Sequence, residues 1–490
     1  MVSTEKSSSQ AIRARLGHPI IDSDGHTLEV TPTFLEYVKQ IGGRKLADRF
    51  AKQFETSVIA RSAWLQMSAD ERRDMWTSAG PWWAAPTINT LDRATAMLPR
   101  LLNQRMDELG IDFTVIYPSW RPGLMRFADE QDEEIRRVAS RALNTYLMDV
   151  YGPCSDRMTP AAFIPMHTPE EAIEELEYAV DVLGMKVAVI AGLVRRPIPR
   201  LQREYPGLAT AFHRIDTLGI DSDYDYDPFW QRCIDLKIAP AAHASRFEWE
   251  GQGSISNYVY NHIGAFATAG EALCKSLFMG GVTKRFPSLR VAFLEGGVAW
   301  ACTLYANMIG HWEKRNGKAI RDLNPSNLDQ DLLFQLIDQY GDKITRSKLE
   351  DVRKVFATPE PAPEELDDWI RCPMERAEEI KDLFVEPFYF GCEADDPTNA
   401  WAFNTKINPF GARLKVIFGS DIGHWDVPDM REVVAEAYEL VEGGTMTEED
   451  FRDFTFTNAV TFYGNMNPNF FKGTRVEAEA AKVLESQGRE

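Results

Sequence analysis

The sequence predicts an α/β fold, specifically a (β/α)8 TIM-like barrel with helical insertions. Eight short apolar or β-branched runs alternate along the chain with helical patterns. Most of these runs are nearly continuous in apolar residues, which is typical of parallel strands covered on both faces. A minimal barrel of this kind needs about 250 residues. The chain has 490 residues, so the surplus must lie in insertions.

The eight runs are the expected strands. They span Pro19 to Asp24, Ile111 to Tyr117, Met158 to Pro165, Lys186 to Ala191, Ile238 to Ala242, Arg290 to Glu295, Leu383 to Phe390 and Leu414 to Ser420. A doubly wound sheet is the alternative architecture. However, no G-x-G-x-x-G motif follows the first run, where a nucleotide-binding fold would have it.

Helical patterns fill the intervals between the strands. The expected helices span Asp129 to Val150, Pro169 to Leu183, Asp227 to Lys237, Gly270 to Phe286, Val298 to Lys314 and Val427 to Val441. Pro169 followed by two glutamates is a sound helix start, because proline suits the first turn and acids stabilise the positive end of the helix dipole.

We expect a single barrel domain over residues 1–490, with insertions at about 27–105, 193–226 and 316–380. Loops that leave the carboxyl ends of barrel strands surround the active site. The insertions are therefore expected to form a lid or an oligomer contact, and a homo- or hetero-oligomer is one prediction.

Charge and composition exclude several classes of protein. Lys and Arg total 54 against 74 Asp and Glu, a formal net charge of −20, which argues against nucleic acid as a partner. No stretch approaches the ~18 consecutive apolar residues of a membrane helix, and the first residues lack the apolar region of a secretory signal. We therefore expect a cytoplasmic protein without a membrane partner. The six cysteines are scattered with no C-x-x-C pair, which indicates reduced, mostly buried thiols.

The expected strand ends carry side chains that can bind metal. The first strand ends in Asp24 and His26, the fifth in His243, the sixth in Glu295 and the eighth in Asp421. All carboxyl ends of a parallel barrel point to one face, so these side chains can converge. The period of two along a strand places Asp24 and His26 on the same side. The sequence therefore predicts a metal site at this face.

These residues lie in stretches that resemble the amidohydrolase superfamily, in the branch of aminocarboxymuconate semialdehyde decarboxylase and related metal-dependent hydrolases. The stretches are residues 20–26, 281–297 and 419–426, the last reading Gly-Ser-Asp-Ile-Gly-His-Trp-Asp. The resemblance implies metal ligands at Asp24, His26 and His243, and a catalytic, metal-binding aspartate at Asp421. The chain departs from the family pattern in three ways: it has Asp24 and Glu295 at positions where the family commonly has histidine, and it has no lysine after the fourth strand.

The charges of the five expected ligands indicate which metal ions the site can bind and how many. Three carboxylates and two neutral imidazoles bring about −3, which a single Zn²⁺ would not offset in a desolvated pocket. Either one carboxylate stays off the metal or two ions are bound. Oxygen-rich mixed ligands suit Fe or Mn at least as well as Zn, so the expected cofactor is a divalent metal, Zn or Fe/Mn, as one ion or two.

Further candidates follow the strand ends. His262, in the loop after the fifth strand, is expected to touch metal or substrate. His424 either relays protons or only hydrogen-bonds its loop. Arg121 either clamps a substrate carboxylate or makes a surface salt bridge. Trp425 is expected at the substrate, since the many aromatic residues near strand ends favour a small hydrophobic or aromatic ligand.

The leading prediction is hydrolysis of an amide, ester or thioester carbonyl by metal-activated water, with Asp421 taking the water proton and returning it to the leaving group. The family resemblance also implies non-oxidative decarboxylation of an aromatic or unsaturated acid as the second interpretation. A dinuclear iron or manganese site that activates oxygen is the third. A non-catalytic barrel acting as a subunit of a larger complex is the fourth.

Overall fold

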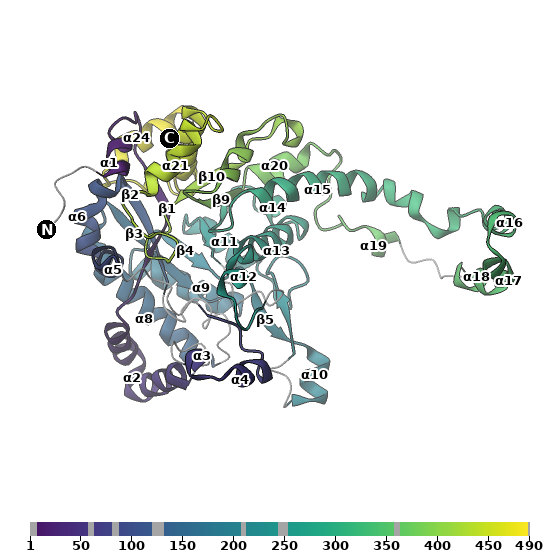
Figure 1. The fold of residues 1–490 in the computed structure, drawn as a ribbon, viewed down its shortest axis with the longest axis horizontal. Helices are drawn as coiled ribbons and strands as arrows, with labels where there is room; N and C mark the ends of the chain where they lie inside the picture. The colour runs from purple at the N-terminus through teal and green to yellow at the C-terminus, as the bar shows by residue number, and fades with distance from the viewer. Residues whose placement is uncertain are drawn as a thin grey trace.

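A computed structural model describes residues 7–56, 63–80, 88–119, 132–206, 212–243, 253–356 and 363–488. Its central feature is an eight-stranded parallel sheet in the order β1-β2-β3-β4-β7-β8-β9-β10 (Figure 1). The strands are β1 (Ile21–Thr27), β2 (Phe113–Pro118), β3 (Met158–Ile164), β4 (Val187–Ile190), β7 (Pro240–Ala242), β8 (Val291–Phe293), β9 (Phe388–Glu393) and β10 (Lys415–Gly419).

The sheet curls until its two edge strands meet. The amide of Asp421, just after β10, donates to the carbonyl of Asp24 on β1 over 2.9 Å, and the amide of His26 donates to the carbonyl of Ile422 over 3.1 Å. These bonds join the first strand to the last one and make a nearly closed barrel. The predicted (β/α)8 barrel is confirmed.

Helices separate the strands and cover the outside of the barrel. The principal ones are α8 (Glu133–Tyr151), α9 (Pro169–Glu177), α11 (Asp227–Asp235), α13 (Ala265–Met279), α15 (Ala299–Arg315), α20 (Glu379–Val385), α21 (Val433–Glu442) and α23 (Asn458–Met466). Helix α9 begins as expected, because Pro169 is its first residue and the Thr168 side chain accepts a hydrogen bond from the amide of Glu171.

The remaining elements are shorter or belong to the expected insertions. They are α1 (Ser8–Arg13), α2 (Thr31–Thr56), α3 (Ala63–Gln66), α4 (Ala69–Asp74), α5 (Thr90–Met97), α6 (Pro99–Leu109), β5 (Val194–Pro197), α10 (Pro199–Glu204), β6 (His213–Asp216), α12 (Tyr258–His262), α14 (Val282–Arg285), α16 (Gln330–Tyr340), α17 (Lys343–Ser347), α18 (Leu349–Phe356), α19 (Pro363–Leu366), α22 (Glu448–Arg452) and α24 (Glu477–Ser486). Short 3₁₀ and π turns add η1 (Gly152–Cys154), η2 (Tyr178–Val182), η4 (Ala319–Leu323), η5 (Pro325–Asn327), η6 (Pro397–Phe403), η7 (Pro409–Gly411) and η8 (Asp453–Thr457).

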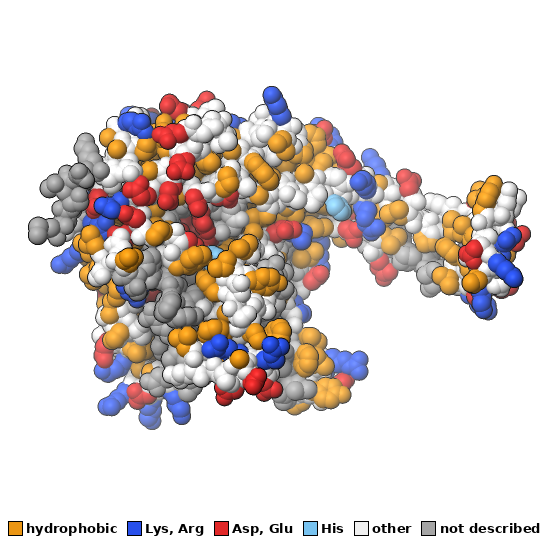
Figure 2. Space-filling view, viewed as in Figure 1, with side chains coloured by type: hydrophobic (Ala, Val, Ile, Leu, Met, Phe, Trp, Pro, Cys, Tyr) orange, Lys and Arg blue, Asp and Glu red, His pale blue; other side chains and the backbone are white. Residues whose placement is uncertain are grey.

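The third insertion leaves the barrel. Helices α16, α17 and α18 lie at the far end of a projection that continues from α15 (Figure 1), and hydrophobic side chains are visible on its surface (Figure 2). The second insertion holds an antiparallel hairpin of β5 and β6 that we did not expect. Among the described residues, no helix combines the length and the apolar character that crossing a membrane requires.

Several expected boundaries differ from the structure. The helix expected over residues 427–441, for example, begins only at Val433. Two other differences have a clear local cause. Residues 383–385 belong to helix α20 rather than to a strand, because Pro387 separates the helix from β9 and shifts the strand toward Glu393. The helix expected over residues 270–286 is two helices, α13 and α14. The break falls at Gly281, whose φ of +75° is a left-handed conformation that glycine adopts without strain.

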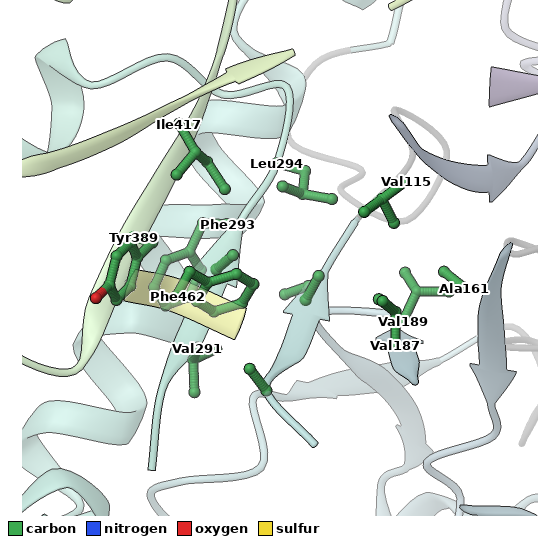
Figure 3. Close-up of a cluster of buried hydrophobic side chains, with 14 of the residues drawn as sticks. Val115, Ala161, Val187, Val189, Val291, Phe293, Leu294, Tyr389, Ile417 and Phe462 are labelled. Carbon is green, nitrogen blue, oxygen red and sulfur yellow. The ribbon is translucent and has the colours of Figure 1, made fainter. Parts of the chain in front are cut away.

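The core fills the barrel and the layer between strands and helices. Val115, Val189, Phe293 and Ile417 come from strands far apart in the chain and point toward one another (Figure 3). All are at most 1% exposed. All six cysteines are buried and free, as the sequence predicts.

Candidate metal centre

The five expected ligands come together at the carboxyl ends of the strands. Asp24 and His26 are on β1, His243 directly follows β7, and Glu295 and Asp421 lie two residues beyond β8 and β10. Each of the five is between 1% and 7% exposed. The convergence that the sequence predicts is therefore present, although hundreds of residues separate the first ligand from the last.

The side-chain nitrogen and oxygen atoms of these five residues lie close enough together to bind the same metal ion. The Nε2 atom of His26 lies 3.4 Å from Asp24 Oδ1, 3.2 Å from Asp421 Oδ1 and 3.3 Å from His243 Nε2. His243 Nε2 lies 3.3 Å from Glu295 Oε2. Ligands of one tetrahedral ion with bonds of 2.0–2.1 Å are separated by about 3.3 Å. The spacing of these atoms fits a metal ion between them.

Two more histidines adjoin the five residues. His424 Nδ1 is 2.6 Å from Asp421 Oδ1, and its ring stacks on that of His26 with 4.0 Å between the ring centroids. Its other nitrogen, Nε2, is 3.2 Å from Ser119 Oγ. His262 Nε2 lies 3.6 Å from Glu295 Oε1. His424 is thus placed as a potential ligand as well as a proton carrier.

The donor atoms form two groups that share one histidine. His26, Glu295, Asp421 and His424 make the first group, and Asp24, His26 and His243 make the second; within each group the donor atoms lie within 4.8 Å of one another. Asp24 Oδ1, Glu295 Oε2 and Asp421 Oδ2 are buried and accept no hydrogen bond of good geometry. Buried carboxylate oxygens without donors are costly, so a cation suits this arrangement.

The charged side chains of the site shift one another's pKa values. Burial opposes protonation of His26, but the carboxylates of Asp24 and Asp421 outweigh it and raise the pKa of the imidazole well above its usual value. Burial alone would raise the pKa of Asp421. Instead, His424 and His26 hold that pKa below its ordinary range. Asp421 is therefore the ionised centre of this cluster.

The pKa values of two further carboxyl groups are raised by burial and by the charges of the same cluster. Burial, followed by the charges of Asp421 and Glu295, raises the pKa of Glu393 to about 10. Burial and Asp421 raise the pKa of Asp426 to about 8. Glu393 is the last residue of β9, three residues beyond the expected end of that strand, and a correct strand boundary would have revealed it.

Asp22 holds the strand ends in place. Its Oδ1 accepts hydrogen bonds from the amides of Asp24 and Ser420, and its Oδ2 accepts from the hydroxyls of Thr114 and Ser420. This side chain thereby ties β1 to β2 and to the end of β10. Glu295 and Asp421 themselves have φ of 57° and 49°. Left-handed conformations in residues other than glycine store backbone strain and cluster at functional sites.

The remaining expected site residues divide into three cases. His262 and Trp425 lie at the mouth, with 5.5 Å between their ring centroids, and Tyr258 is 6.0 Å from Trp425. Arg121 lies outside the described residues. The aromatic residues near strand ends that we expected to favour an aromatic ligand include Phe388 and Tyr389, but both are fully buried in the core, so that interpretation is wrong for these two residues.

Comparisons with known proteins find several solved structures that this chain resembles. The chain resembles an amidohydrolase from Mycobacterium avium subsp. paratuberculosis K-10, with a TM-score of 0.53 and 16% identity over 92% of this chain and 100% of that one. It is also similar to 2,6-dihydroxybenzoate decarboxylase from Rhizobium (TM-score 0.44, 16% identity, 91% and 98% covered). A third is 5-carboxyvanillate decarboxylase from Novosphingobium aromaticivorans DSM 12444, solved with manganese (TM-score 0.45, 13% identity, 94% and 98% covered).

The first of these structures supports the barrel fold. At the level of sequence, a family model described as amidohydrolase matches residues 69–320, just over half of the chain. The resemblance noted in the sequence is thereby confirmed. The chain belongs to the amidohydrolase family.

Proposed function

We propose that this protein is a metal-dependent hydrolase with a centre for two divalent ions. The observation that carries the proposal is the pair of donor groups that share His26. One ion would be held by Asp24, His26 and His243, and the second by Glu295, Asp421 and His424. Both sets consist of carboxylates and imidazoles, which are ligands that Zn, Fe and Mn accept.

The charge of the buried carboxylates supports two ions over one. Asp24, Glu295 and Asp421 carry −3 when ionised, and one divalent ion would leave an excess of negative charge in a buried site. Glu393 adds a fourth carboxyl group; burial, followed by the charges of Asp421 and Glu295, raises its pKa and disfavours its ionisation when no cation is near. Four carboxylates match the charge of two divalent ions, so metal loading would ionise Glu393.

Bound divalent ions would lower the pKa of a water from 15.7 to about 7 and polarise a carbonyl group. Asp421 is positioned as the base, because neither of its buried carboxylate oxygens accepts a hydrogen bond of good geometry from the described residues, and His26 and His424 lie beside its Oδ1. His262, Tyr258 and Trp425 form one wall of the mouth, which favours a small substrate with an apolar or aromatic part.

Oxygen activation is the second candidate function. The donor set favours it because the candidate ligands are only carboxylates and imidazoles, and open sites of this composition are typical of non-haem iron oxygenases. Decarboxylation of an aromatic or unsaturated acid stays a third prediction, since a chelated carboxylate would occupy the same mouth.

Metal analysis and three assays test the proposal. Protein purified from its own host should contain close to two equivalents of metal, and Glu295→Ala should lose about one. Glu174→Ala, at an exposed glutamate on α9, is the matched control and should retain both. Chelated and reconstituted protein is then offered acyl esters, anilides and thioesters, aromatic acids with CO₂ detection, and the same compounds in an oxygen electrode.

Metal-dependent release of alcohol, amine or thiol is the expected result. One equivalent of zinc in the native protein, with Glu295→Ala still fully loaded, would exclude the two-ion centre. Metal-dependent CO₂ release or oxygen consumption without acyl cleavage would replace hydrolysis by the corresponding alternative.

A further inference from the structure

Three hydroxyl groups lie buried together next to the candidate metal centre. They belong to Ser23 on β1, Tyr117 on β2 and Tyr463 on α23, which are 0%, 0% and 2% exposed. The Tyr463 hydroxyl lies beside those of Tyr117 and Ser23, but none of the three forms a hydrogen bond of good geometry with any described residue. A buried hydroxyl of this kind lowers stability, because it gives up its bonds to water without replacing them. Apolar side chains of similar shape would avoid that loss.

The ring of Tyr117 adjoins both imidazoles that would hold the first ion. Tyr117 lies opposite His26 in the register of β1 and β2. Its ring centroid is 6.3 Å from that of His26 and 6.2 Å from that of His243, at interplanar angles of 51° and 48°. The two imidazoles are nearly perpendicular to each other, with 5.1 Å between their centroids. One side chain can therefore fix the angle at which both rings face an ion.

Both phenols are also close enough to Asp24 to respond to its charge. Burial raises the pKa of Tyr117 well above its ordinary value, and the neighbouring Tyr463 and the charge of Asp24 add to this effect. Burial raises the pKa of Tyr463 as well, again with a contribution from Asp24. Both phenols are therefore protonated and carry an O–H group that can donate. Carboxylates that bind metal are commonly held by such neighbours, and removing the neighbour typically weakens metal binding about 10- to 100-fold.

We propose that these three side chains are positioning residues for the first of the two proposed ions. With the ion bound, their hydroxyl groups hold the carboxylate of Asp24, and the ring of Tyr117 sets the angle of the two imidazoles. This role rests on the metal centre of the proposed function, but not on hydrolysis, because any reaction at that centre needs the same ion. The buried hydroxyls thus lower the stability of the metal-free protein and raise its affinity for metal.

Metal affinity and stability, measured on the same variants, test this proposal. Co²⁺ is titrated into chelated full-length protein, and its visible absorption reports the geometry around the bound ion. Tyr117→Phe and Tyr463→Phe should each raise the dissociation constant of one of the two ions about tenfold or more, and should shift its absorption. Without metal, the same variants should melt at or above the wild-type temperature, because each has lost a buried hydroxyl that lacked a hydrogen bond.

Tyr389→Phe is the matched control. Tyr389 is also 0% exposed, but its hydroxyl is hydrogen-bonded to Thr461 Oγ1 over 3.1 Å. The control should therefore show the opposite result, a melting temperature below that of the wild type and an unchanged affinity for Co²⁺. Tyr117→Leu removes the ring as well as the hydroxyl and should retain only one equivalent of Co²⁺, while circular dichroism verifies that it folds.

The outcomes separate this role from the proposed function. Unchanged affinity and absorption in both phenol variants, with Co²⁺ bound to the wild type, would overturn the positioning role alone. Metal-free phenol variants that melt well below the wild type would also overturn it, since the hydroxyls would then be ordinary structural groups. A wild type that binds no Co²⁺ would overturn the metal centre together with this role. Absence of hydrolysis, with the expected Co²⁺ results, would refute the proposed reaction and still support the role.

Discussion

Gly25 separates the two ligands of the first strand, and Gly25→Ala should damage the metal centre. A Cβ atom at this position would lie 2.7 Å from Thr114 Oγ1 and 2.8 Å from Asp22 Oδ2. These two atoms are hydrogen-bonded to each other over 2.7 Å, so neither can move away freely. Overpacking costs about 1–3 kcal/mol, and the weakened hydrogen bond adds about 1 kcal/mol. A gain of about 0.5 kcal/mol from the less flexible unfolded chain offsets part of this.

The net loss is therefore about 2–3 kcal/mol. Unfolding entropy near the melting temperature is about 2.1 cal/mol/K per residue, or roughly 1 kcal/mol/K for a chain of this length, so the melting temperature should fall by about 2–3 °C. Calorimetry measures this shift, and metal analysis should show partial loss of metal because Asp24 and His26 are displaced.

Gly310→Ala is the matched control for this substitution. Gly310 lies inside α15, and no atom lies within 4 Å of the position that its Cβ would occupy. Alanine there should stabilise the protein by about 0.5–1 kcal/mol, since it favours helix over glycine. If Gly25→Ala melts at or above the wild-type temperature with full metal content, the packing argument at the first strand is refuted.

Two other outcomes are expected. Burial raises the pKa of Glu175 from 4.5 to about 7 against the opposing effects of Asn144 and Arg141, so the wild type should lose stability as pH rises from about 4.5 to 7. Glu175→Gln should remove this loss, and urea titrations should show the variant gaining about 1.4 kcal/mol per pH unit over the wild type in that window. Removing both ions of the proposed centre with a chelator should lower the melting temperature by about 8 °C, because each ion present at 1,000 times its Kd contributes about 4.1 kcal/mol.

Controls distinguish these effects from general damage. Glu174→Gln, at the exposed neighbour of Glu175, should follow the wild type at every pH, and a constant gap between wild type and Glu175→Gln would contradict the burial argument. Chelation should not change the melting of Asp421→Asn prepared without metal. An equal drop in both proteins would mean that the chelator acts elsewhere.

The barrel was predictable because its strands carry their signal locally. A run such as Val187 to Ile190 is apolar on both faces, and only a strand covered on both sides needs that pattern. The boundaries were less predictable where the chain changes direction. Pro387 sets the start of β9, and Gly281 sets the break between α13 and α14. The backbone angles at such positions depend on the neighbouring elements.

The candidate site was predictable as far as strand ends could be located. Asp24, His26, His243, Glu295 and Asp421 each follow an apolar run, and the barrel topology implies that they meet. Glu393 was missed because the sequence predicts a strand that ends at Phe390, whereas the strand in the structure continues to Glu393. The stacking of His424 on His26, and the hydrogen bonds that Asp22 accepts from two other strands, involve side chains with no signal in their local sequence.

By itself, the sequence determined the alternation of strands and helices, the residue types available at the barrel mouth, and the acidic charge of the whole chain. Each of these follows from neighbouring residues or from composition alone. Only the tertiary structure decided which donor atoms share His26, which carboxyl groups lie in reach of Asp421, and that α16 to α18 lie apart from the barrel. Those properties depend on distances between segments far apart in the chain, and such distances exist only once the chain has packed.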